Sequence, residues 1–111
     1  MNHWRKQTYT LAGRWPAGES NQVQGLVCGN FGVHKIPVDQ YAADRRPYRL
    51  THVPTGRKLG DFDRQGDARH AATRLEGLAD WGFTVDDTFT RFTDTQRELF
   101  CRILRDPFGG V

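Results

Sequence analysis

Two histidines are the residues whose type and spacing come nearest to catalytic or metal chemistry. His34, in FGVHKIP, and His52, in LTHVPTG, fall in segments that alternate as β-strands do. If the two strands pair in a suitable register, both imidazoles lie on one face and offer a general acid-base pair or two metal ligands. No HxxxH, HExxH or His-Asp cluster supplies further ligands. We therefore expect strand histidines that are hydrogen-bonded at a partly exposed sheet face, with no metal site and no catalytic residue.

Other signatures of enzyme chemistry are equally incomplete. The segment GRKLG at residues 56–60 lacks the GxxxxGK[ST] spacing of a phosphate loop and continues as a strand. Cys28 and Cys101 lie in apolar contexts, LVC and LFC, that are typical of core thiols, and no CxxC pair indicates a zinc ribbon. The sequence predicts a non-enzymatic protein without a cofactor.

The strongest surface signal is a basic cluster on a predicted hairpin. Basic residues on an antiparallel ribbon, with Trp4, Tyr41 and Tyr48 available for stacking, can follow a phosphate backbone. They can equally protect an edge strand from pairing with other chains, and the sequence leaves both interpretations open. The cluster consists of Arg45, Arg46, Arg49, Arg57 and Lys58.

Charge is segregated along the chain. Residues 1–58 hold nine Lys/Arg against three Asp/Glu, a net charge of +6, whereas residues 59–111 hold seven against ten, a net charge of −3. Such a dipolar surface steers a charged partner into one orientation. An acidic patch in the second half would suit a basic channel on a protein partner, and its residues are Asp80, Asp86, Asp87 and Asp94.

The elements that position these residues are clearest between residues 46 and 81. Residues 48–53 alternate as a strand, Pro54-Thr55-Gly56 favours a turn, and a return strand follows. Asp63 is a candidate cap for the helix that comes next. The apolar residues of that helix recur at helical spacing, and they are Ala68, Ala71, Ala72, Leu75, Leu78 and Ala79.

The rest of the chain completes an α+β domain. Residues 4–11 alternate as a strand, and two short strands flank Gly29-Asn30. Thr93 and Gln96 have capping-box spacing before an apolar stripe that Asp106-Pro107 ends. We predict a three- to five-stranded antiparallel sheet with two helices packed on one face. The single domain, residues 1–111, comprises a strand-rich basic half (1–62) and a helix-rich acidic half (63–111).

No run of 18 apolar residues and no apolar signal-peptide core occurs, so we expect no membrane association. Two cysteines 73 positions apart suit a reducing cytoplasm. The expected location is therefore the cytoplasm of a bacterial host, given the resemblance that follows.

The TH-x-PTG turn, its return strand and the helix RQGDARHAATRLEGL resemble the hairpin-helix core of small proteins encoded by phages, prophages and plasmids. The likeness covers about a third of the chain, and a similar arrangement occurs in arm-type DNA-binding domains of phage integrases and in some anti-CRISPR proteins. This resemblance implies a non-enzymatic inhibitor that contacts a host protein or ribonucleoprotein, such as a nucleic-acid-handling or CRISPR effector complex. The alternative is a nucleic-acid-binding protein that uses the basic hairpin.

Overall fold

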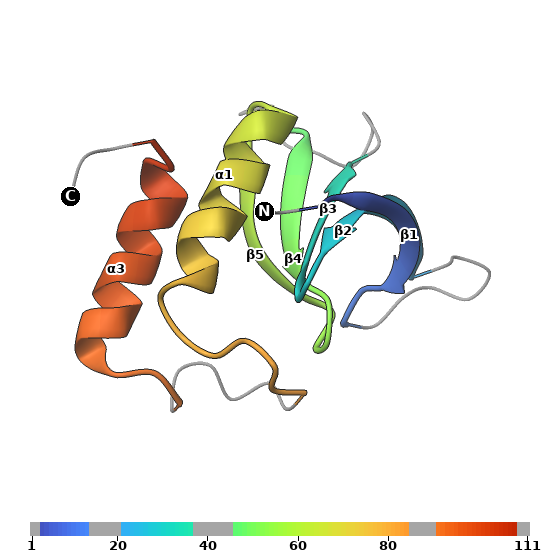
Figure 1. Cartoon of the computed structure of the whole chain (residues 1–111). Helices are drawn as coiled ribbons and strands as arrows, with labels where there is room; N and C mark the ends of the chain where they lie inside the picture. Colours follow the sequence, from blue (N-terminus) through green and yellow to red (C-terminus); the bar gives the residue numbers. More distant parts are fainter. Residues whose placement is uncertain (1–2, 14–20, 37–45, 85–90, 109–111) are drawn as a thin grey trace.

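The computed structural model describes residues 3–13, 21–36, 46–84 and 91–108 of the chain. It is an α+β fold in which one antiparallel sheet has the strand order β1-β2-β3-β4-β5, with helices on one side (Figure 1). The predicted fold class is therefore confirmed. The elements are β1 (Arg5–Thr10), β2 (Gln22–Cys28), β3 (Phe31–Lys35), β4 (Tyr48–His52), β5 (Arg57–Phe62), α1 (Gln65–Glu76) and α3 (Asp94–Arg105).

Helix α1 lies directly on the sheet, and α3 packs beside α1 (Figure 1). The face of α1 that is buried carries three alanines and Leu75, which allows the helix to approach the strands closely. Leu75 and the facing Val33 and Leu50 are at most 1 % exposed. Leu104 of α3 reaches the edge strand β5. Its Cδ2 atom would lie 3.1 Å from a Cβ atom added to Gly60 of that strand. The apolar spacing predicted for α1 thus forms the main core.

One of the two predicted helix caps is present in the structure and the other is not. The N-cap of α1 is Arg64 and has no side-chain cap hydrogen bond, so the expectation that Asp63 caps this helix is wrong. Helix α1 begins one residue too late for Asp63 to cap it. It also ends before Leu78 and Ala79, at Gly77, a residue that helices seldom continue through. In α3 the predicted capping box is present, with reciprocal hydrogen bonds between Thr93 and Gln96.

The sheet curls, so that the end of β1 meets the β4–β5 turn. The Ala12 amide donates to the Gly56 carbonyl at 2.8 Å, and a Cβ at Gly56 would lie 2.6 Å from the Thr10 carbonyl oxygen. Gly56 also has φ +72°, which favours glycine. Inside the curl, on the face away from α1, a second small core forms from Tyr9, Leu11, Val27, Val23 and Val53.

Trp81, which follows α1, packs into the main core at the C-terminal end of that helix. Its indole Nε1 donates to the Leu75 carbonyl oxygen at 2.6 Å, and its ring contacts Phe31 and Phe92 edge-on. Only 2 % of the residue is exposed. The described helices include none that is long and apolar enough to cross a membrane.

Candidate functional site

The strand register separates the two histidines that the sequence singled out. Phe31 of β3 pairs with His52 of β4, and His34 pairs with Arg49. Directly paired residues share a face and successive residues alternate, so His52 lies on the α1 face and His34 on the opposite face. The condition for an acid-base pair or a shared metal site, two imidazoles on one face, is therefore not met.

His52 joins β4 to the segment that follows α1. Its Nε2 lies 2.6 Å from the Trp81 carbonyl oxygen, which only accepts, so Nε2 carries a proton. Its Nδ1 lies 2.7 Å from the Thr55 hydroxyl. With 1 % of the residue exposed and its ring stacked 4.5 Å from that of Phe83, His52 is a structural histidine. The hydrogen-bonded role that the sequence indicated is present, but the expected partly exposed position is wrong, because His52 is buried under Trp81 and Phe83.

His34 forms a buried polar pair with Tyr9 on the other face. The Tyr9 hydroxyl and His34 Nδ1 are 3.2 Å apart. Burial and, to a smaller extent, the positive charge of Arg49 lower the pKa of His34 to about 4, against the opposing effect of the Asp61 carboxylate. Burial also raises the pKa of Tyr9 to about 12. Both rings are therefore neutral at pH 7.

Most of the described basic hairpin is charge-paired. Arg49 makes two hydrogen bonds to the Asp61 carboxylate, at 2.9 and 3.2 Å, and Lys58 lies 3.2 Å from the same group. Burial alone would raise the pKa of Asp61, but Arg49 and then Lys58 outweigh it, and the net shift is downward. Arg46 is 3.9 Å from Asp63. Arg57 lines a separate hollow between β5 and α3, and Arg45 lies outside the described residues.

The predicted acidic patch is also locally engaged where the structure describes it. Asp80 accepts a hydrogen bond from the Gly82 amide at 2.9 Å, and Asp94 pairs with Arg97 within α3. Asp86 and Asp87 lie outside the described residues. The role of this patch in binding a partner stays a prediction.

A cleft opens where β2 and β3 separate. These strands pair only from Leu26↔Val33 to Cys28↔Phe31, while β2 continues along β1 to Gln22 and β3 continues along β4 to Lys35. Gly25 stands at the point of separation, where an added Cβ would lie 2.3 Å from the Val33 carbonyl oxygen. The absence of a side chain therefore lets the β2 backbone lie close to Val33 at the base of the cleft. We call the resulting hollow the fork cleft.

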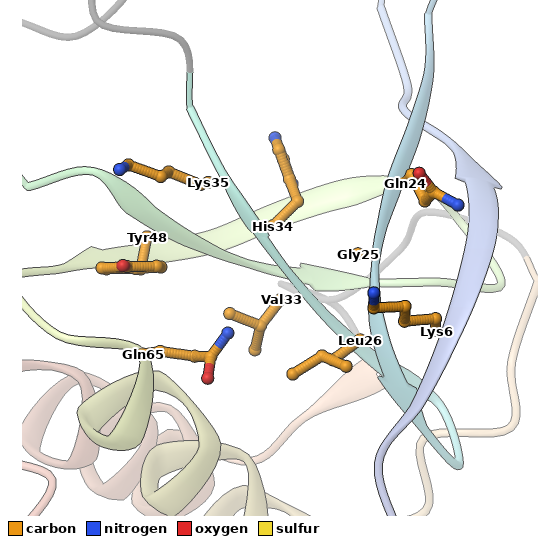
Figure 2. A pocket seen from close by; sticks show the side chains of 9 residues that line it. All are labelled: Lys6, Gln24, Gly25, Leu26, Val33, His34, Lys35, Tyr48 and Gln65. Carbon is orange, nitrogen blue, oxygen red and sulfur yellow. The ribbon is translucent and has the colours of Figure 1, made fainter.

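The fork cleft has a volume of about 310 Å³, near the lower end of the range for ligand pockets. Figure 2 shows Lys35 and Tyr48 on one side and Lys6 and Gln24 on the other, with Gln65 reaching in from the start of α1. Apolar side chains line its base. The described lining residues are Lys6, Gln24, Gly25, Leu26, Val33, His34, Lys35, Tyr48 and Gln65.

The surface around the fork cleft is positively charged. Residues 3–13 and 21–36, which form β1 to β3, contain Arg5, Lys6 and Lys35 but no Asp or Glu. All three of these basic residues are exposed, and within the described parts of the chain Lys6 and Lys35 form no ion pair. The described lining of the fork cleft thus has two ammonium groups, two carboxamides and one phenol but no carboxylate. This combination suits an anionic ligand.

Sequence reasoning placed the basic site on the hairpin and missed Lys6 and Lys35. A usable signal existed, because the chain carries no acidic residue before Glu19 and none from residue 20 to residue 38.

Among the described residues, no group of three or more His, Cys, Asp or Glu is placed to hold a metal ion. No family model, curated protein or solved structure matches the chain.

Proposed function

We propose that this chain is a nucleic-acid-binding protein that holds the phosphate backbone at the fork cleft. The observation that carries the proposal is the pair Lys6 and Lys35 on opposite sides of a cleft with no acidic residue in its described lining (Figure 2). Lysine ammonium groups bind phosphate as point charges, and each such contact releases condensed counterions.

The cleft also offers groups for the other parts of a nucleotide. Gln24 and Gln65 present carboxamides, which both donate and accept hydrogen bonds. The half-buried Tyr48 presents a phenol ring beside Lys35. A phosphate group flanked by hydrogen-bonding and aromatic groups is the pattern by which proteins hold nucleotides without strict sequence preference.

Charge pairing favours this site over the basic hairpin. Arg49 and Lys58 share the Asp61 carboxylate, so part of their charge is neutralised before any ligand arrives. A phosphate at the hairpin would compete with Asp61, whereas a phosphate at the fork cleft meets no described acidic competitor. Binding to a host protein or ribonucleoprotein, which the phage-type resemblance implied, remains the competing hypothesis.

The test compares two double variants that lose the same charge. Lys6→Ala/Lys35→Ala removes the lysines of the fork cleft, and Arg46→Ala/Lys58→Ala removes two basic residues of the hairpin. Fluorescence anisotropy with labelled single-stranded and duplex oligonucleotides should show at least a tenfold loss of affinity in the first variant and a smaller loss in the second. Circular dichroism verifies that both variants are folded.

Two outcomes would contradict the proposal. Wild-type protein that binds no oligonucleotide at physiological salt, but captures a host protein from nuclease-treated bacterial lysate, would favour the protein-partner hypothesis. A larger loss of affinity in the hairpin variant than in the fork-cleft variant would move the nucleic-acid site to the hairpin.

A further inference from the structure

A second hollow lies next to the fork cleft. In α1, Gln65 lines the fork cleft and the next residue, Gly66, lines the second hollow. Near β1, Lys6 lines the fork cleft and Trp4 lines the second hollow. The two sites are therefore neighbours around the first turn of α1. We call the second one the aromatic groove. It has a volume of about 340 Å³ and its described lining is Trp4, Gly66, Arg69, His70, Thr73 and Phe108.

Two aromatic rings line this groove: Trp4 lies beside an arginine, and Phe108 stacks on a histidine. Phe108 is 61 % exposed, and it is the only large apolar residue that the described part of the chain exposes to this degree. The His70 ring stacks on it at a centroid distance of 4.2 Å and an interplanar angle of 13°. Because His70 covers one face of the ring, the high exposure of Phe108 leaves the other face accessible. The Arg69 guanidinium lies 5.5 Å from the centroid of the Trp4 ring.

Phe108 is held in place although it follows the last helix. Arg74 of α1 donates from Nη1 to the carbonyl oxygens of Asp106, at 3.3 Å, and Pro107, at 2.9 Å. These bonds tie the end of the chain after α3 back to α1, immediately before Phe108. An exposed phenylalanine fixed in this way presents a preformed stacking surface and loses little conformational freedom when a ligand binds.

We infer that the aromatic groove is a base-stacking subsite, so that the ligand of the fork cleft is single-stranded nucleic acid and not duplex. This inference rests on the proposed function, because the phosphates of the same strand occupy the fork cleft. An unpaired base has a free π face that stacks on an aromatic ring, and such stacking tolerates any sequence. Bases inside a duplex are already stacked on their neighbours and offer no such face.

The charges of the groove agree with this ligand. Arg69 lines it and no described lining residue is acidic. Asp67, in the same first turn of α1, does not line either hollow. A strand that runs from the fork cleft to the aromatic groove therefore passes from Lys35 and Lys6 to Arg69 and Phe108, with phosphates near the cations and a base on the ring.

The test is Phe108→Ala with Phe108→Trp as the matched control. Phe108 is largely exposed, so neither substitution should impair folding. We expect Phe108→Ala to weaken binding of a 12-nucleotide single strand by about 5-fold to 100-fold, with the dependence of affinity on salt unchanged because no phosphate contact is lost. Phe108→Trp should restore wild-type affinity. Duplex affinity should be weaker than single-strand affinity and the same in all three proteins.

The results separate this inference from the proposed function. If wild-type protein and Phe108→Ala bind the single strand equally, while Lys6→Ala/Lys35→Ala weakens binding, the proposed function stands and the base-stacking subsite is wrong. Equal wild-type affinity for duplex and single strand also overturns the subsite. If the wild-type protein binds neither oligonucleotide, the proposed function fails and the subsite fails with it.

Discussion

Acidification from pH 7 to pH 4 should destabilise the protein through His34. The pKa of this histidine falls from 6.5 to about 4 in the folded state, chiefly because of burial. Between these values the unfolded chain holds a proton on His34 that the folded chain lacks, so stability is fully present above pH 6.5 and is lost as the pH falls toward 4. Each pKa unit is worth about 1.4 kcal/mol, which gives a loss of about 3 kcal/mol between pH 7 and pH 4.

The charged and titratable groups around His34 leave this pH window free of other effects. Tyr9 titrates near 12, and the pKa of Asp61 is held below 3.8, so the stability that Asp61 contributes is lost as the pH falls below about 3.8. His34→Gln is the matched variant, because glutamine can still hydrogen-bond to the Tyr9 hydroxyl. Subtracting its pH profile from that of the wild type cancels the other histidines, which both proteins share.

The assay is urea unfolding, followed by tryptophan fluorescence, at pH 7, 6, 5 and 4. We expect the free energy of unfolding of the wild type to fall by about 3 kcal/mol more than that of His34→Gln over this range. Parallel profiles for the two proteins would refute the reasoning, since they would mean that His34 takes up its proton equally well in the folded and unfolded states.

Two further substitutions test the packing of the fold. Leu75→Ala, at a position with 0 % exposure, should lower the free energy of unfolding by about 2 to 5 kcal/mol in urea melts. Unchanged stability would contradict the place of Leu75 in the main core. Thr51→Val should leave stability unchanged or raise it by about 1 kcal/mol, because Thr51 Oγ1 is buried without a hydrogen-bond partner among the described residues. A drop of more than about 1 kcal/mol would instead reveal a hydrogen bond to Tyr9 in solution.

The fold was largely predictable because its signals are local. The alanine spacing of α1, the Thr93 capping box and the turn at Pro54-Thr55-Gly56 each depend on a few neighbouring residues. The start of α1 was less predictable, because Asp63 is the better local cap but the backbone becomes helical only after Arg64, whose side chain makes no cap hydrogen bond. Trp81 is a central core residue through contacts with β4 and α1 that no sequence period describes.

The candidate site was not predictable because it depends on long-range pairing. His34 and His52 each show strand alternation, but only the register Phe31↔His52 places them on opposite faces. The fork cleft likewise exists because β2 stops pairing with β3 beyond Leu26, a limit that no local pattern encodes. Acidic residues that neutralise the hairpin, Asp61 above all, were visible in the sequence, but their contacts with Arg49 and Lys58 were not.

The salt dependence of single-strand binding tests the central claim most directly. Removing two phosphate contacts from a single strand should reduce the slope of log affinity against log salt by about 1.4, or 0.7 for each contact. We predict this reduction for Lys6→Ala/Lys35→Ala and a much smaller one for Arg46→Ala/Lys58→Ala, which loses the same charge from ion-paired positions. Equal slopes for the wild type and the fork-cleft variant would contradict the claim that Lys6 and Lys35 bind phosphate.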